Sequence, residues 1–227
     1  MNGRSTKVKP GAKVLKAASL REQVYEHLRE RIQSGQLTFE DRLVDVDIAD
    51  EFGVSRMPVR EALMQLVHDG MIESSTRGFI LRRYSDQEIA DIFEIRRLLE
   101  PAAAQIAATK MTDAALKIMD DAIHAGIKAS NADDFTAFLR ANAAFRGAWM
   151  DQVPNAQLIA ALARYIDHVQ VIRLVTLSQR TVRDDVMDRL RSIHDAFRDR
   201  DAERVGDLFR EHVDAAVRAY RTYSKPH

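Results

Sequence analysis

Residues 53–63 read Gly-Val-Ser-Arg-Met-Pro-Val-Arg-Glu-Ala-Leu, which predicts a tight turn followed by an amphipathic helix. Gly53 permits the turn, and Ser55 is placed to cap a helix that begins near Arg56. Arg56 and Arg60 are four residues apart, so they share one exposed face, and the apolar residues that follow them occupy the opposite face. Two guanidinium groups at the exposed start of such a helix can contact guanine edges or grip phosphates, as recognition helices do in the major groove of DNA.

The spacing of hydrophobic residues around this stretch predicts three helices and then a β-hairpin. Helices are expected over residues 19–34, 46–52 and 56–70. The period then changes, and two short strands are expected over residues 71–75 and 79–83. Three helices followed by a two-stranded wing outline a winged helix-turn-helix domain, which we expect to span residues 19–84.

The remainder of the chain has a helical pattern to its end. Ser85 and Glu88 form a capping box, and the helix that they open should extend to about Lys110, with a bend at Pro101. Turn and cap residues divide the chain beyond Lys110 into about five more helices. The predicted fold class is therefore mainly α, with a C-terminal all-helical bundle of six or seven helices over residues 85–227.

The composition is that of a folded protein large enough for two domains. The chain has 227 residues, of which 46% are hydrophobic and 30% charged, and its formal net charge is zero. That balance alone would not indicate nucleic-acid binding, but residues 1–21 contain basic residues and no acidic one. We expect residues 1–18 to form a flexible basic tail, which can be a solvated leader, an arm that touches DNA phosphates, or both.

Several classes of protein receive no support from the sequence. There is no cysteine, so disulfides and thiolate metal sites are excluded. No apolar run approaches the length needed to span a bilayer, and the basic N-terminus lacks the apolar segment of a secretory signal. We therefore expect a cytoplasmic protein without a membrane partner.

The N-terminal part resembles the GntR family of bacterial transcription regulators. The likeness is carried by Ile48-Ala49, residues 53–63, Leu66, Gly70-Met71-Ile72 and Arg77-Gly78-Phe79. In that family the residues at the places of Arg56 and Arg60 contact double-stranded DNA. The resemblance thus implies a DNA-binding set made up of Ser55, Arg56, Met57, Arg60, Arg77 and Gly78. Val46 stands where the family often has a basic residue, so the sequence departs from the pattern there.

The C-terminal part is similar to the effector domain (FCD domain) of the FadR-type branch. Residues 94–100, followed by the alanine-rich stretch to Ala108, resemble the opening helix of that domain. A matching arginine often faces the ligand cavity, which implies this place for Arg96. His194 and His212 match positions at which many members carry metal-binding imidazoles. The resemblance also implies a homodimer that senses a small ligand.

The metal site implied by the resemblance is altered in this chain. Asn142 and Arg146 occupy the places of an Asp/His pair, and a guanidinium cannot ligate a metal. If zinc or nickel is bound, His194 and His212 would hold it, but we expect no metal to be required. The expected effector site is instead a cavity for a small anionic metabolite, a carboxylate, bound by paired hydrogen bonds from Arg146. Its predicted lining is Arg96, Asn142, Arg146, His194 and His212, and protonation of the imidazoles should raise anion affinity toward lower pH.

Structural roles remain open for the same residues. His194 and His212 can be hydrogen-bonded bundle residues, Arg146 can form a surface ion pair, and Arg96 can pair with Glu100 four residues on. The aromatic residues near Arg146 are expected in the core rather than in a stacking platform; they are Phe135, Phe138, Phe145 and Trp149.

The residues and the resemblance together imply a ligand-responsive regulator. Such a protein, most often a repressor in this family, binds a near-palindromic operator as a homodimer. An enzyme built on His194 and His212 lacks a nucleophile–base pair and an intact set of metal ligands. An architectural DNA-binding protein without a ligand remains the other alternative, because the helical part could serve assembly alone.

Overall fold

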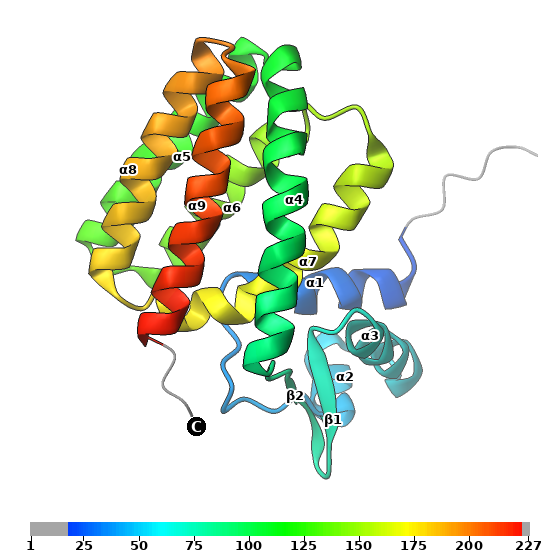
Figure 1. The fold of residues 1–227 in the computed structure, drawn as a ribbon. Coiled ribbons are helices and arrows are strands. Elements are labelled where there is room, and N and C mark those ends of the chain that lie inside the picture. Colours follow the sequence, from blue (N-terminus) through cyan, green and yellow to red (C-terminus); the bar gives the residue numbers. More distant parts are fainter. Residues whose placement is uncertain (1–17, 224–227) are drawn as a thin grey trace, which may run out of the picture.

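The structure, a computed structural model, describes residues 18–223 except for the side chains of residues 167, 170 and 171. Figure 1 shows a small N-terminal part, with three helices and a hairpin, at one end of a larger helical bundle. The predicted mainly-α architecture is confirmed. The predicted basic tail, residues 1–18, lies outside the described residues apart from Ala18.

The N-terminal part has the predicted order of three helices and a wing. Its elements are α1 (Leu20–Gln33), α2 (Asp45–Phe52), α3 (Arg56–His68), β1 (Ile72–Ser75) and β2 (Gly78–Leu81). The strands pair antiparallel, with Ile72 opposite Leu81 and Ser75 opposite Gly78. Leu28, Leu63 and Leu66 are fully buried between the helices.

Two glycines in this part occupy conformations that other residues rarely adopt. Gly53 ends α2 with φ 63°, in the left-handed region, which makes the turn into α3. Gly78 has φ 116°, and a Cβ atom there would lie 2.5 Å from the main-chain oxygen of Leu43. The carbonyl approaches this closely because Leu43 forms a β-bridge with Phe79, so the wing is anchored to the segment before α2.

The bundle consists of α4 (Asp86–Lys110), α5 (Asp113–Asn131), α6 (Phe135–Met150), α7 (Ala156–Thr176), α8 (Arg180–Arg198) and α9 (Ala202–Tyr223). The predicted capping box of Ser85 and Glu88 opens α4, and the helix continues through the buried Pro101. Helix α4 packs mainly on α9, while α5 packs on α6 and α8 (Figure 1). Phe138, Phe145 and Trp149 are buried, which confirms their predicted core position, and Phe135 packs against the same core.

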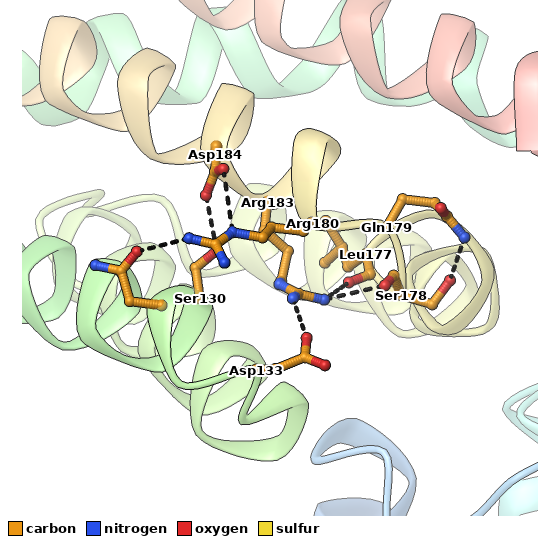
Figure 2. Close-up of polar contacts among 9 residues, drawn as sticks. Ser130, Asp133, Leu177, Ser178, Gln179, Arg180, Arg183 and Asp184 are labelled. Atoms are coloured by element: carbon orange, nitrogen blue, oxygen red, sulfur yellow. Dashed lines mark hydrogen bonds and ion pairs between the residues drawn. The ribbon is translucent and has the colours of Figure 1, made fainter.

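The connection between α7 and α8 is held by a buried arginine. Arg183 donates through Nη1 to the carbonyl oxygens of Leu177 and Ser178, both at 3.0 Å, and through Nη2 to Asp133 (Figure 2). Asp133 belongs to the turn between α5 and α6 and has φ 54°. The guanidinium therefore fixes the end of α7 against the start of α8 and the α5–α6 turn, as Figure 2 shows.

The two parts of the chain contact one another through α7. Leu174 packs against the cores of both parts. His168 approaches the carbonyl oxygen of Asp69, at the end of α3, through Nε2 at 2.9 Å, and Tyr84 donates to the carbonyl oxygen of Gly70. The rings of Tyr84 and His168 stack with centroids 5.6 Å apart. Across the described residues, no helix has the length and apolar character required to cross a membrane.

Candidate functional site

The start of α3 presents the predicted recognition residues to solvent. The side chain of Arg56 is 62% exposed, Met57 is 71% exposed, and Arg60 is exposed one turn later. Ser55 occupies the N-cap position with extended backbone, but its side chain makes no capping hydrogen bond. The hydroxyl of Ser55 and the first amide groups of α3 thus lie at the same helix end as the two arginines, an arrangement suited to a phosphate group.

A carboxylate of the preceding helix orients Arg56. The Nη2 atom of Arg56 lies 3.0 Å from Oδ2 of Asp45, in the first turn of α2. This hydrogen bond holds the pKa of Asp45 below its ordinary value, and the positive charges of Arg56 and Arg60 lower it further. Asp45 is therefore ionised at neutral pH, and a DNA phosphate must compete with it for Arg56.

The wing carries the two other predicted contacts. Arg77 is exposed in the turn between β1 and β2. Gly78 is explained by the close approach of the Leu43 carbonyl, which is a structural reason for glycine at this place. Val46, on α2, is 40% exposed.

The bundle contains a cavity of about 310 Å³ among α7, α8 and α9. Its polar lining includes Arg96, Asn142, Arg173 and His212. Because Arg96 and Asn142 are buried, these groups lie at the inner end, whereas the exposed Thr222 and Tyr223 lie at the outer rim. Figure 1 shows the end of α7, the start of α8 and the end of α9 meeting at one end of the bundle.

A second, smaller cavity of about 20 Å³ lies next to this inner end and shares its polar groups. It is lined by residues of α4, α6, α7, α8 and α9, namely Arg96, Glu100, Asn142, Phe145, Arg146, Trp149, Arg173, Leu190, Phe209 and His212. The structure thus brings together four residues of the predicted effector set: Arg96, Asn142, Arg146 and His212.

Arg96 contributes an incompletely paired buried charge to this region. Its side chain is 3% exposed, and its Nε donates to Oε1 of Glu100 at 2.5 Å. The Nη1 atom is buried and has no hydrogen-bond partner among the described residues. Burial would raise the pKa of Glu100, but the charge and hydrogen bond of the adjacent Arg96, with the charge of Arg146, hold that pKa below its ordinary value. Arg96 therefore both pairs with Glu100 and faces the cavity, so the two alternatives for this residue hold together.

His212 is neutral at physiological pH in this structure. Burial lowers its pKa to about 4; Glu100 opposes this shift, and Arg96, Arg173 and Arg146 add to it. Its Nδ1 is buried without a partner among the described residues. Burial beside arginines thus places the protonation of His212 well below neutral pH, so any rise in anion affinity from its protonation is expected only toward a pH of about 4.

Arg146 and Asn142 contact one another on α6. The Nη2 atom of Arg146 donates to Oδ1 of Asn142 at 2.9 Å, so the amide orients the guanidinium. Both residues also line a third cavity, of about 180 Å³, which reaches Arg29 and Gln33 of α1. Asn142 therefore lines the 310 Å³ cavity as well as the cavity that reaches α1, whereas Arg146 joins the latter to the small cavity.

The structure does not bring His194 to these cavities. Its Nε2 lies 3.2 Å from the carbonyl oxygen of Leu116 on α5, and its Nδ1 lies 3.9 Å from Asp195. Leu190, one turn earlier on α8, lines the small cavity instead. This is the hydrogen-bonded bundle role that the sequence left open for His194.

Arg173 is the residue that sequence reasoning missed. It lines all three cavities and faces the same space as Arg96, Arg146 and His212. A signal was present, because Arg173 is a single charge in the apolar run from Ile172 to Val175. A charge at such a place is rarely buried without partners.

The donor set of these cavities does not fit zinc or nickel. Among the side chains that the structure describes, no group of three or more His, Cys, Asp or Glu residues could hold a metal ion. His212 offers one imidazole and Asn142 an amide oxygen, whereas Glu100 is already paired with Arg96. The guanidinium groups of the lining would repel a divalent cation and attract an anion.

Two protein families match the chain. Residues 20–79 match the family described as bacterial regulatory proteins, gntR family, and residues 91–215 match the FCD domain. The HTH-type transcriptional regulator YdhC of Bacillus subtilis is 28% identical over 155 residues, which cover 67% of this chain and 69% of that protein. The gluconate operon transcriptional repressor of the same organism is 40% identical over 89 residues, or 39% of this chain and 37% of that one.

Solved structures share the fold. Escherichia coli McbR/YncC superposes with a TM-score of 0.82 and 20% identity, covering 92% of this chain and 100% of the other. A GntR-type transcriptional regulator from Rhodococcus sp. RHA1 has a TM-score of 0.75 and 23% identity, covering 90% of this chain and 99% of the other.

Proposed function

The chain belongs to the gntR family of bacterial regulatory proteins with an FCD domain, and from this premise we propose that it is a repressor whose operator affinity is set by a small carboxylate. Its family and relatives are DNA-binding transcriptional regulators rather than enzymes. We place this regulator in the cytoplasm. Its DNA-binding domain and its effector domain meet near Tyr84.

Operator recognition is assigned to the start of α3 and to the wing. The exposure of Arg56, Met57 and Arg60 supports this assignment, because these side chains can enter a major groove without rearrangement of the core. Arg77 is exposed in the wing turn and can contact the phosphate backbone of the DNA beside the major groove. Ser55 and Gly78 complete the proposed contact set through the N-terminus of α3 and the wing backbone.

The operator is proposed to be near-palindromic and bound by a homodimer. Two recognition helices related by a two-fold axis reach half-sites one helical turn apart. Leu98 is 68% exposed and Ile106 36% exposed, two turns apart on α4, and they offer an apolar surface to a second copy. The name of the gluconate operon repressor, a relative, supports repression over activation.

In vitro selection from a random double-stranded DNA library tests the DNA side of the proposal. We expect enrichment of two inverted half-sites, and sedimentation of the protein alone as a dimer. Enrichment of one undivided site by a monomeric protein would contradict the homodimer.

One observation carries the effector side of the proposal: the buried, unpartnered Nη1 of Arg96 at the inner end of a cavity. Arg146 and Arg173 add positive charge there, against the carboxylate of Glu100. A carboxylate ligand supplies the acceptor that Nη1 lacks and forms charge-assisted hydrogen bonds with the guanidinium groups. No metal is needed for this recognition, because the arginines supply the positive charge.

Calorimetry with small carboxylates tests this assignment. The protein should bind a carboxylate after treatment with a chelator. Arg146→Ala should weaken binding by roughly tenfold or more, because it removes a positive charge beside the inner end and the hydrogen bond that orients Asn142. Arg191→Ala is the matched control, since Arg191 is exposed on α8 and pairs with Asp188. Equal affinity in Arg146→Ala and the wild type would remove Arg146 from the site.

A further inference from the structure

We infer that the effector is an amphipathic monocarboxylate, with one carboxylate head and an apolar body of several carbons. The inference rests on the proposed function, in that the cavity of about 310 Å³ among α7, α8 and α9 is taken as the effector site. It goes further by assigning the chemistry of the ligand beyond its charged group, and it excludes polyhydroxylated acids and dicarboxylates.

The position of the head group follows from the unpartnered polar atoms. Nη1 of Arg96 and Nδ1 of His212 are buried without partners among the described residues, and both side chains line the cavity. Arg96 is 2% exposed, so these donors are far from bulk water. A carboxylate placed at this inner end accepts from Arg96 and from the neutral imidazole of His212, with Asn142 and Arg173 beside it.

The walls between the inner end and the rim are mostly apolar. Of the two threonines in the lining, Thr176 already donates its hydroxyl to the carbonyl oxygen of Ile172, and Thr181 is exposed. Val169 and Ile172 of α7 are each 2% exposed, and they line the cavity together with Val182 and Val186 of α8. The wall on α9 is formed by small side chains that leave the space open: Ala215, Ala216 and Ala219. A hydroxyl group in this part of the cavity would lose its hydrogen bonds to water and find few replacements, whereas a methylene chain loses nothing.

The rim of the cavity offers no favourable site for a second carboxylate of the ligand. Arg189 is engaged by Asp185 in a two-bond ion pair, with N–O distances of 3.0 and 3.1 Å. A second carboxylate here would meet Asp185 as well as Arg189 and the exposed Arg218. The cavity volume of about 310 Å³ is at the small end for ligand sites, which fits one charged head and a short apolar body.

The inference is tested by calorimetry on the full chain with acetate, butanoate, hexanoate and octanoate, compared with gluconate and glutarate. We expect affinity to rise about fourfold for each methylene buried, until the cavity is full. Hexanoate should bind at least tenfold more tightly than gluconate or glutarate.

Variants of the wall sharpen the test. Ala219→Leu fills part of the apolar space, so it should weaken octanoate binding at least tenfold and leave acetate binding unchanged. Val186→Thr keeps the shape but adds a hydroxyl group, and should lower hexanoate affinity several-fold. Ala144→Leu, at an exposed position of α6 away from these cavities, is the matched control and should change neither.

The possible outcomes distinguish a failure of the amphipathic ligand from a failure of the carboxylate site itself. If gluconate or glutarate binds more tightly than hexanoate, the amphipathic ligand is wrong while the carboxylate site stands. If Ala219→Leu affects no acid, the apolar body does not lie along α9, and the inference again fails. If none of the acids binds the wild type, the proposed effector site itself is overturned.

Discussion

His168, on α7, contacts the carbonyl oxygen of Asp69 at the end of the recognition helix α3, with Nε2 at 2.9 Å. Helix α7 also carries Arg173, which lines the proposed effector cavity a little more than one turn beyond His168. A shift of α7 on ligand binding would therefore move a contact with α3. This geometry offers a direct physical connection between the cavity and the helix proposed to contact DNA.

The first prediction concerns this contact. His168→Ala should leave carboxylate binding and operator binding within about threefold of the wild type, but should reduce the change in operator affinity caused by the ligand. The measurement is fluorescence anisotropy of operator DNA with and without a saturating carboxylate. An unchanged ligand response in His168→Ala would show that coupling does not pass through this contact.

The second prediction concerns the recognition arginines. Arg56→Ala and Arg60→Ala should each cost about 1–3 kcal/mol of operator binding and relax specificity at one position in each half-site, if they contact bases. A phosphate contact would instead weaken all sequences equally and reduce the salt dependence. Arg191→Ala serves as the control, and unchanged operator affinity in both variants would remove them from the interface.

The third prediction follows from the Asp45–Arg56 ion pair at 3.0 Å. Asp45→Asn removes a carboxylate that repels phosphates and competes for Arg56, so binding to random DNA should tighten at low salt. The ratio of specific to random affinity should fall, since Arg56 is less firmly oriented. Weaker binding to random DNA would contradict this interpretation.

The fourth prediction concerns pH. The pKa of His212 falls from 6.5 to about 4 on folding, so the unfolded chain binds more protons between these values. The free energy of unfolding should therefore decrease as pH falls from 6.5 toward 4, and His212→Gln should flatten this dependence. Urea unfolding at several pH values measures it. His124→Gln is the control, because the His124 side chain is 73% exposed, and an equal effect of both variants would contradict the assignment.

The local elements were predictable from the sequence because their signals are local. The recognition helix was expected over residues 56–70 and spans Arg56–His68. The capping box of Ser85 and Glu88 marked the start of α4. Both depend on spacings of a few residues, which the sequence displays directly.

The proposed effector cavity was only partly predictable, because it depends on how helices are rotated about their axes. His194 and Leu190 are one turn apart on α8, and a small rotation decides which of them faces the cavity. The contact between His168 and Asp69 joins residues 99 positions apart, for which no local pattern exists. The burial that moves the pKa of His212 likewise depends on packing among several helices.

The fifth prediction is the most direct test of a metal-free carboxylate sensor. It concerns the operator affinity of chelator-treated protein, measured by fluorescence anisotropy with and without a carboxylate that calorimetry shows to bind. Metal analysis of the same sample should find substoichiometric zinc and nickel. We expect a shift in operator affinity of at least fivefold for the wild type at saturating ligand, and the same shift for Arg146→Ala only at a ligand concentration about tenfold or more higher. Tightly held stoichiometric metal, with the ligand response abolished by its removal, would contradict such a sensor, as would a bound carboxylate that leaves operator affinity unchanged.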